Sequence, residues 1–188
     1  MLGGLSRMQQ DLDKSLVGWL SGFSAAGSYT ASYRVVDLFT QPVISAVEAR
    51  QAEWFAAAQN GRRYVTRQMN RLCRVLVLYG LLVCAGLYAG SDYVVLLFGE
   101  EYHDAAGYVA LGAGIPAVFA VWIVTRAGLV ALGSRNFVLR SEGAGIAFMV
   151  AGNLLLLPTY GVVAAIIMTY ASYGLMAAVQ LYKLGAGE

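Results

Sequence analysis

Charged residues are scarce in this chain. Asp, Glu, Lys and Arg make up 13% of its 188 residues, against about 25% in an ordinary soluble domain. The ranges 105–125 and 143–182 carry no charge at all, hydrophobic residues make up 59%, and the mean hydropathy is +0.61. Apolar runs of this length are typical of helices that cross a bilayer. The sequence therefore predicts an all-α, polytopic membrane protein.

Residues that commonly bind metals or carry out catalysis are also rare, with two cysteines and one histidine. Cys73 and Cys84 lie on one expected helix, about 16 Å apart along its axis, so they cannot form a disulfide bond. His103 stands in the acidic stretch 100–104, whose spacing fixes no metal geometry. Ser-His-Asp sets, Walker loops and zinc motifs are absent. We therefore expect no enzyme activity, no metal and no cofactor.

The segment 29–50 is long enough to cross a bilayer as a helix, yet it carries charges well inside its length. At 100° per residue its polar side chains fall within about 80° of one another: Thr30, Arg34, Asp37, Gln41, Ser45 and Glu48. A lone charge at bilayer depth costs on the order of 2.5–3.5 kcal/mol on insertion scales. This polar stripe is therefore expected to face other helices or water. It either lines a transport or binding cavity, or Arg34 and Asp37 neutralise each other and serve packing alone.

The alternation of apolar runs and polar breaks predicts six transmembrane helices, at about residues 5–22, 29–50, 72–90, 105–133, 141–157 and 161–183. Tight turns are expected at 22–28 and 158–161. Pro42 is expected to kink the second helix, because proline removes a backbone hydrogen bond. In the fifth helix, small residues at helical spacing form a seam suited to close packing: Gly143, Ala147 and Ala151.

A basic segment, 53–74, lies between the second and third helices and holds five arginines, four of them on one helical face. Between two apolar spans, such a segment is expected at a membrane surface with anionic lipids rather than on nucleic acid. Counted over alternate connections, ten Lys and Arg residues fall on one side of the membrane and none on the other. The positive-inside rule then places the segment 53–74 and both termini in the cytoplasm.

Arg126 interrupts the apolar run 105–133. Trp122 precedes it by one helical turn, which allows a cation–π contact. The Arg126 side chain can equally extend toward the end of its helix and reach the membrane surface. The sequence leaves both readings open.

Four stretches in this order resemble one transporter family. The stretch 11–39, DLDKSLVGWLSGFSAAGSYTASYRVVDLF, resembles the seventh and eighth helices of polysaccharide (O-antigen type) flippases, which belong to the multidrug, oligosaccharidyl-lipid and polysaccharide exporter superfamily. The stretches LLFGEEYHDAA, ALGSRNFVLR and GNLLLLPTYGVVAAIIMTYASY resemble later connections and helices of the same family. Val163 departs from the pattern, since the family has glycine at that place.

The resemblance implies that the six helices are the carboxy-terminal lobe of a two-lobe transporter, a fragment without the amino-terminal lobe. It implies a multi-pass protein of the bacterial inner membrane, in lipopolysaccharide or other polysaccharide biosynthesis. The protein would move an isoprenoid-pyrophosphate-linked oligosaccharide between leaflets by alternating access. Its partners would be this lipid-linked substrate, membrane lipids and the missing lobe or a partner chain. The residues expected in the substrate cavity are Arg34, Asp37, Gln41, Thr30 and Arg126.

In such a cavity Arg34 would pair with the pyrophosphate, because guanidinium is a planar and always charged partner for phosphate. Two other functions remain open. The chain is either a non-transporting membrane subunit or remnant, or an exporter of cationic drugs. Cationic cargo would favour exposed acidic residues, whereas Arg34 and Arg126 stand here beside Asp37, which favours an anionic ligand.

Overall fold

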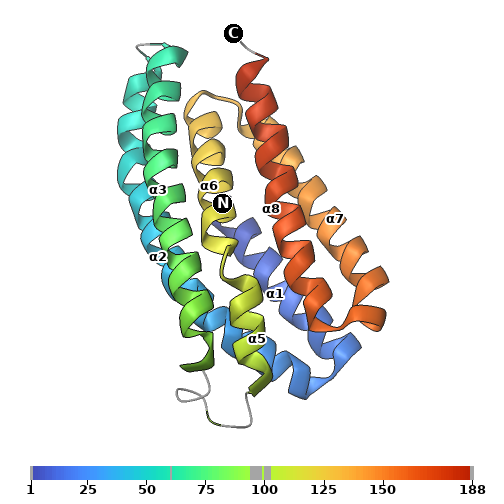
Figure 1. The fold of residues 1–188 in the computed structure, drawn as a ribbon. Helices are drawn as coiled ribbons and strands as arrows, with labels where there is room; N and C mark the ends of the chain where they lie inside the picture. Colours follow the sequence, from blue (N-terminus) through green and yellow to red (C-terminus); the bar gives the residue numbers. More distant parts are fainter. Residues whose placement is uncertain (1, 60, 94–98, 100–102, 187–188) are drawn as a thin grey trace.

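The computed structural model describes residues 2–59, 61–93, 99 and 103–186, with side chains from residue 12 onward except at 103. All regular structure in these ranges is helical, which confirms the predicted all-α class. Seven α-helices and one 3₁₀ helix form an elongated bundle (Figure 1). They are α1 (Leu2–Ser21), α2 (Phe23–Ala58), α3 (Arg62–Gly90), η1 (Ser91–Tyr93), α5 (His103–Gly112), α6 (Ile115–Ala131), α7 (Arg135–Tyr160) and α8 (Val162–Gly185).

Helix α6 forms the centre of the bundle. It packs against α2, α3 and α8, and most of its residues are buried, as expected of a helix that is apolar on all sides. Helix α1 packs against α2 and α7, and α7 packs along α8. Where α3 meets α6, the backbone of Ala117 occupies the space that a side chain at Gly80 would need. This contact brings the two helices close together, as small residues do in membrane bundles.

Three helices are long and apolar enough to cross a membrane: α3 extended by η1, α7 and α8. Helices α5 and α6, which meet at a bend of 42°, pass the same test as one broken span. These three or four candidate spans make the chain a multi-pass membrane protein. Among the described helices, α1 and α2 do not pass the test, because charged and polar side chains lower their mean hydropathy. The predicted total of six crossings therefore stays a prediction.

Helix boundaries differ from the prediction around the basic segment. The expected turn at 22–28 is reduced to Gly22, which has a φ of 90°, and α2 then runs unbroken to Ala58. Ala, Glu and Gln dominate residues 48–58 and favour helix strongly, so α2 continues past the expected end at 50. The second break is at Gly61, with a φ of 105°. The basic residues are not a separate segment but the first turns of α3.

The later boundaries also shift. Helix α7 begins at Arg135, and Pro158 lies inside it, so that Gly161, with a φ of 57°, is the one residue between α7 and α8. The expected helix 105–133 is divided into α5 and α6, and Pro116 falls in the first turn of α6, where its missing N–H is not needed. Pro42 lies inside the continuous α2, which changes direction along its length in Figure 1. The acidic connection 99–104 lies mostly outside the described residues.

Candidate functional site: a polar stripe and a buried carboxylate

The predicted polar stripe lies along one side of α2. Arg34, Gln41, Ser45 and Glu48 are exposed, and Thr30 and Asp37 are half-buried. The opposite side of α2 packs into the bundle through Tyr29, Tyr33, Val36, Val43 and Val47, which are almost fully buried. The helical spacing therefore separates a packed side from a polar side, and the polar side remains accessible.

Arg34 and Asp37 do not form an ion pair. The ion pairs within 4.0 Å among the described side chains are Arg50 with Glu53 and Arg126 with Glu142. The backbone oxygen of Asp37 accepts a hydrogen bond of 2.9 Å from the Thr40 hydroxyl. The guanidinium of Arg34 is consequently available to an anion from outside the chain.

Arg126 has partners inside the bundle. Its Nε donates to Oε1 of Glu142 at 2.5 Å, and its Cζ lies 5.5 Å from the ring centroid of Trp122, so the cation–π contact is present. The Arg126 side chain is 13% exposed and that of Glu142 2%. The ion pair links α6 to α7. These contacts do not test whether Arg126 lines a substrate cavity, which stays a prediction.

A buried polar cluster centres on Asp13 of α1, which is 3% exposed. The Tyr29 hydroxyl donates to Oδ2 of Asp13, and Nδ2 of Asn153 donates to Oδ1 at 2.7 Å. Oγ1 of Thr169 lies 3.2 Å from Oδ2 of Asp13 and accepts a hydrogen bond of 2.9 Å from the Tyr33 hydroxyl. Four helices, α1, α2, α7 and α8, thus converge on one carboxylate.

The Asp13 cluster is rich in oxygen atoms. No ion pair within 4.0 Å includes Asp13 in the part of the chain whose side chains are described. Among the described residues, the buried Oδ1 atom of Asn153 has no hydrogen-bond partner. The Nδ2 atom of the same side-chain amide is the donor to Asp13. A buried carboxylate in a membrane protein is typical of proton and ion pathways. The arrangement is chemically suited to hold either a proton or a small cation.

Sequence reasoning did not identify this cluster. Asp13, Asn153 and Thr169 lie within the stretches that resemble the flippase family, but none of them is among the residues expected in the substrate cavity. The available signal was polarity inside an apolar run, since Asn153 and Thr169 lie in the charge-free range 143–182. Polar side chains in such a run are expected to face the bundle interior.

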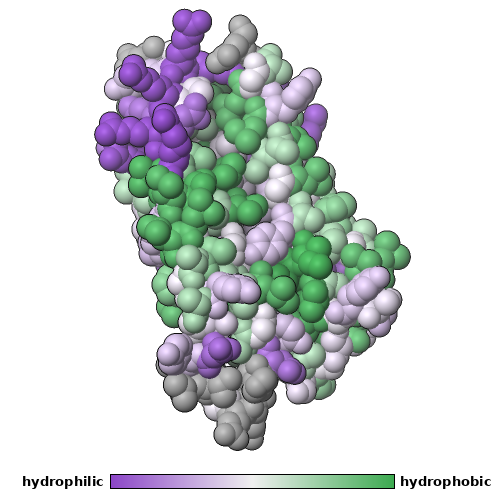
Figure 2. Space-filling view, in the orientation of Figure 1, coloured by the Kyte–Doolittle hydropathy of each residue, from purple (hydrophilic) through white to green (hydrophobic). Residues whose placement is uncertain are grey.

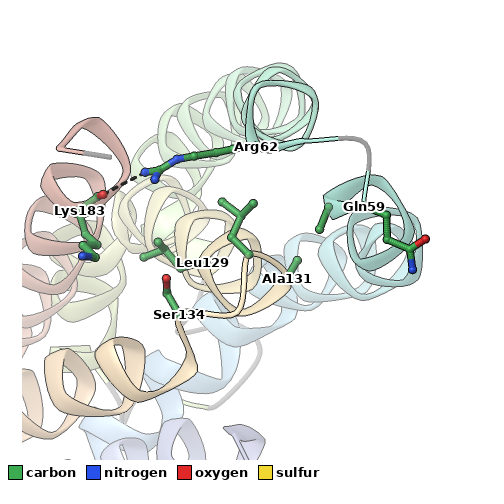
Figure 3. Close-up of a pocket in the computed structure, with 8 residues that line it drawn as sticks. Gln59, Arg62, Leu129, Ala131, Ser134 and Lys183 are labelled. Atoms are coloured by element: carbon green, nitrogen blue, oxygen red, sulfur yellow. Dashed lines mark hydrogen bonds between the residues drawn. The ribbon is translucent and has the colours of Figure 1, made fainter. Parts of the chain in front are cut away.

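A cationic cavity of about 460 Å³ lies where α8 ends (Figure 3). The Arg62 side chain reaches across it from α3 and donates to the backbone oxygens of Lys183 and Leu184, at 3.1 and 2.5 Å. These contacts satisfy carbonyl groups in the last turn of α8, where a positive charge is also favourable. Arg62 therefore has a structural role, because its hydrogen bonds link the start of α3 to the end of α8.

Exposed arginines gather at the same end of the bundle. Figure 2 shows a hydrophilic patch there, above a broad hydrophobic band. Arg67, Arg71 and Arg74 on α3 line a groove of about 640 Å³ together with Tyr64 and Val75. The hydrophobic band below is the part of this face suited to contact lipid tails. The pattern agrees with a membrane surface passing near this end of the molecule.

Comparison with known proteins places the chain among glycan-handling membrane proteins. The family described as polysaccharide biosynthesis protein matches residues 3–107, more than half of the chain. Over 179 residues the chain is 21% identical to a protein of Haloferax volcanii described as the probable low-salt glycan biosynthesis flippase Agl15. The match covers 93% of this chain and 38% of that relative, so the chain spans well under half of its length. No solved structure matches the chain significantly.

Proposed function

Because this chain belongs to the polysaccharide biosynthesis protein family, we propose that it is part of a lipid-linked oligosaccharide flippase. The cargo would be an isoprenoid-pyrophosphate-linked glycan, moved from the cytoplasmic to the outer leaflet of a bacterial inner membrane by alternating access. The observation that carries the proposal is the accessible polar stripe of α2, in which Arg34 forms no ion pair with any side chain that the structure describes. A membrane helix that is otherwise packed keeps such a side only where it meets water or a polar ligand.

Arg34 would bind the pyrophosphate of the cargo. Its guanidinium presents a planar fork of donors that matches two phosphate oxygens, and its charge does not depend on pH. Asp37, one turn further along α2, would neutralise Arg34 when no cargo is bound or exchange a proton during turnover. Gln41 and Thr30 would donate hydrogen bonds to sugar or water, and Arg126 would act at the same cavity only if its pair with Glu142 opens.

The Asp13 cluster would couple transport to an ion. Asp13 joins α1 and α2, the helix with the stripe, to α7 and α8. Binding a proton or a small cation would change the charge at this junction and with it the packing of α2 against the other helices. The binding of cargo at Arg34 would thereby depend on the state of Asp13, as coupled transport requires.

Export of a cationic drug fits the site less well. A cation would need exposed carboxylates, and the exposed charge in the middle of the stripe is Arg34, whereas Asp37 is half-buried. Glu48 is exposed but lies toward the end of α2 that leads to the basic residues. The distribution of charge along α2 favours an anionic ligand.

A direct test is the binding of an isoprenyl pyrophosphate to the purified chain in detergent, measured by calorimetry. Hydrogen bonds to charged groups contribute about 1.5–3 kcal/mol, so Arg34→Ala is expected to weaken binding about 10- to 100-fold. Arg34→Lys keeps the charge but not the fork and should lie in between. Arg63→Ala, at an exposed position on the basic end of α3, serves as the control. Binding by Arg34→Ala as tight as by the wild type would refute the proposal.

A further inference from the structure

We infer that the apolar groove between α2, α3 and α5 holds the isoprenoid chain of the cargo while the pyrophosphate lies at Arg34. The inference rests on the proposed function and extends it from the charged head of the ligand to its lipid tail. It assigns a second contact surface to residues outside the polar stripe.

The groove has a volume of about 800 Å³ and is lined almost entirely by carbon. Arg34 and Leu38 come from α2, Leu82 from α3 and Val109 from α5. Among the described residues that line the groove, Arg34 is the one with a charged side chain. Leu38 is 69% exposed and Leu82 75%, so the walls are open to an apolar ligand. A cation at the margin of an apolar groove matches the shape and chemistry of an amphiphile with a phosphate head.

Two glycines keep the groove open. A Cβ atom at Gly86 or at Gly90 would meet no other atom within 4 Å, so neither glycine is required for helix packing. Both nevertheless line the groove. The space beside α3 thus exists because these two positions lack side chains, and branched isoprene units have room to enter.

Tyr79 lines the groove, and its hydroxyl group already has a hydrogen-bond partner within the chain. Its hydroxyl donates a hydrogen bond of 3.2 Å to the backbone oxygen of Phe39, which also joins α3 to α2 beneath the groove. The aromatic ring remains as an apolar wall. A ligand beside Tyr79 therefore needs no hydrogen-bonding groups along its chain, as is true of an isoprenoid.

The position along α3 gives the depth of the groove in the membrane. Tyr79 and Gly90, at the two ends of the groove on α3, lie 5 and 16 residues beyond Arg74, the last arginine of the basic end, or about 8 and 24 Å along a helix. Since the hydrocarbon core is about 30 Å thick, the groove crosses the middle of the membrane and extends into the half away from the basic residues. It therefore lies at the depth of the lipid tails, where the isoprenoid chain of a membrane-bound cargo would be.

The test compares the affinity of the purified chain for inorganic pyrophosphate and for prenyl pyrophosphates of increasing length. Wild-type affinity should rise with chain length, because each buried methylene contributes about 0.8 kcal/mol. Gly86→Leu places a side chain in the groove at a position where the added Cβ would meet no atom within 4 Å. It should reduce the ratio of the two affinities, long prenyl over inorganic pyrophosphate, by about tenfold or more. Thermal melting checks that the variant is folded.

Gly143→Leu is the matched control, because Gly143 is exposed on α7 and its Cβ also would meet no atom within 4 Å. It should keep the wild-type ratio. An unchanged ratio in Gly86→Leu, or equal competition by phosphatidylglycerol, would refute the isoprenoid groove and leave an ordinary lipid as the occupant. If Arg34→Ala binds inorganic pyrophosphate like the wild type, the proposed function fails instead, so the two failures are distinguishable.

Discussion

Asp13 and Arg34 lie on neighbouring helices, but their side chains differ in burial and in hydrogen bonding. Asp13 is buried and hydrogen-bonded on both carboxylate oxygens, whereas Arg34 is exposed and forms no ion pair among the described side chains. A buried charge with fixed partners suits a small ion, and an exposed fork of donors suits a larger anion. The two residues thus divide the proposed transport chemistry between them.

Replacing Asp13 by alanine is expected to destabilise the bundle by about 2–5 kcal/mol, because the buried Tyr29, Asn153 and Thr169 side chains lose their shared acceptor. Asp13→Asn keeps the shape and one acceptor oxygen and should cost less. Thermal melting in detergent measures the difference. The control is Asp104→Ala, at an exposed carboxylate in the first turn of α5. Equal melting temperatures for the Asp13→Ala and Asp104→Ala variants would contradict the structural part of the account.

The two residues were not equally predictable. Arg34 and the stripe follow from the 100° rotation per residue within one helix, which the sequence contains in full. The Asp13 cluster joins residues up to 156 positions apart, and no local pattern reports which helices converge. Glu142 was missed for the same reason, since its pairing with Arg126 depends on how α6 and α7 pack.

At the scale of helices, the apolar runs predict which segments form helices, but they predict the positions of the helix ends less well. Four of the breaks between described helices contain a single glycine with positive φ: Gly22, Gly61, Gly133 and Gly161. These breaks depend on the glycines rather than on the polar stretches around them. Polar residues that favour helix, as in 48–58, extended α2 beyond the predicted end. The expected seam of Gly143, Ala147 and Ala151 is exposed, and close packing of α7 on α8 instead uses Gly145 against Met176 and Gly152 against Met168.

The pair of Arg126 and Glu142 is expected to stabilise the contact between α6 and α7. Arg126→Ala leaves the Glu142 carboxylate buried without its cation, at a cost of about 3–5 kcal/mol, and the double variant with Glu142→Ala should recover much of this loss. The exposed pair of Arg50 and Glu53 gives the comparison, since Arg50→Ala should cost about 0–1 kcal/mol. Chemical or thermal unfolding measures both. Equal losses in the free energy of unfolding for Arg126→Ala and Arg50→Ala would show that the buried pair stabilises the protein no more than the exposed pair.

At the scale of the whole molecule, the basic residues lie at one end of the bundle (Figure 2), and the proposed groove runs along α3 from Tyr79 to Gly90, away from that end. This separation gives the molecule a direction across the membrane. Lys and Arg near the cytoplasmic surface are the strongest signal for such a direction. The chain covers 38% of the length of the Haloferax volcanii relative.

The orientation predicts that cysteines introduced at Gln59 and Gly107 react from opposite sides of the membrane. Gln59 is exposed at the basic end after α2, and Gly107 is exposed on α5. The background carries replacements of Cys73 and Cys84, which are half-buried. A membrane-impermeant thiol reagent added to whole cells should label position 107 and reach position 59 only after lysis. Labelling of both positions in intact cells would exclude this topology.

The most direct test of the central claim is complementation of surface polysaccharide by the protein with changes at Arg34, with membrane abundance measured alongside. Binding of pyrophosphate predicts partial function for Arg34→Lys and none for Arg34→Ala, with normal abundance. The double change Arg34→Ala with Asp37→Ala should also insert normally and remain inactive. If Arg34 merely neutralises Asp37, Arg34→Ala alone should lower abundance, and the double variant should regain both abundance and activity. Full activity in the double variant would contradict the assignment of Arg34 to the cargo.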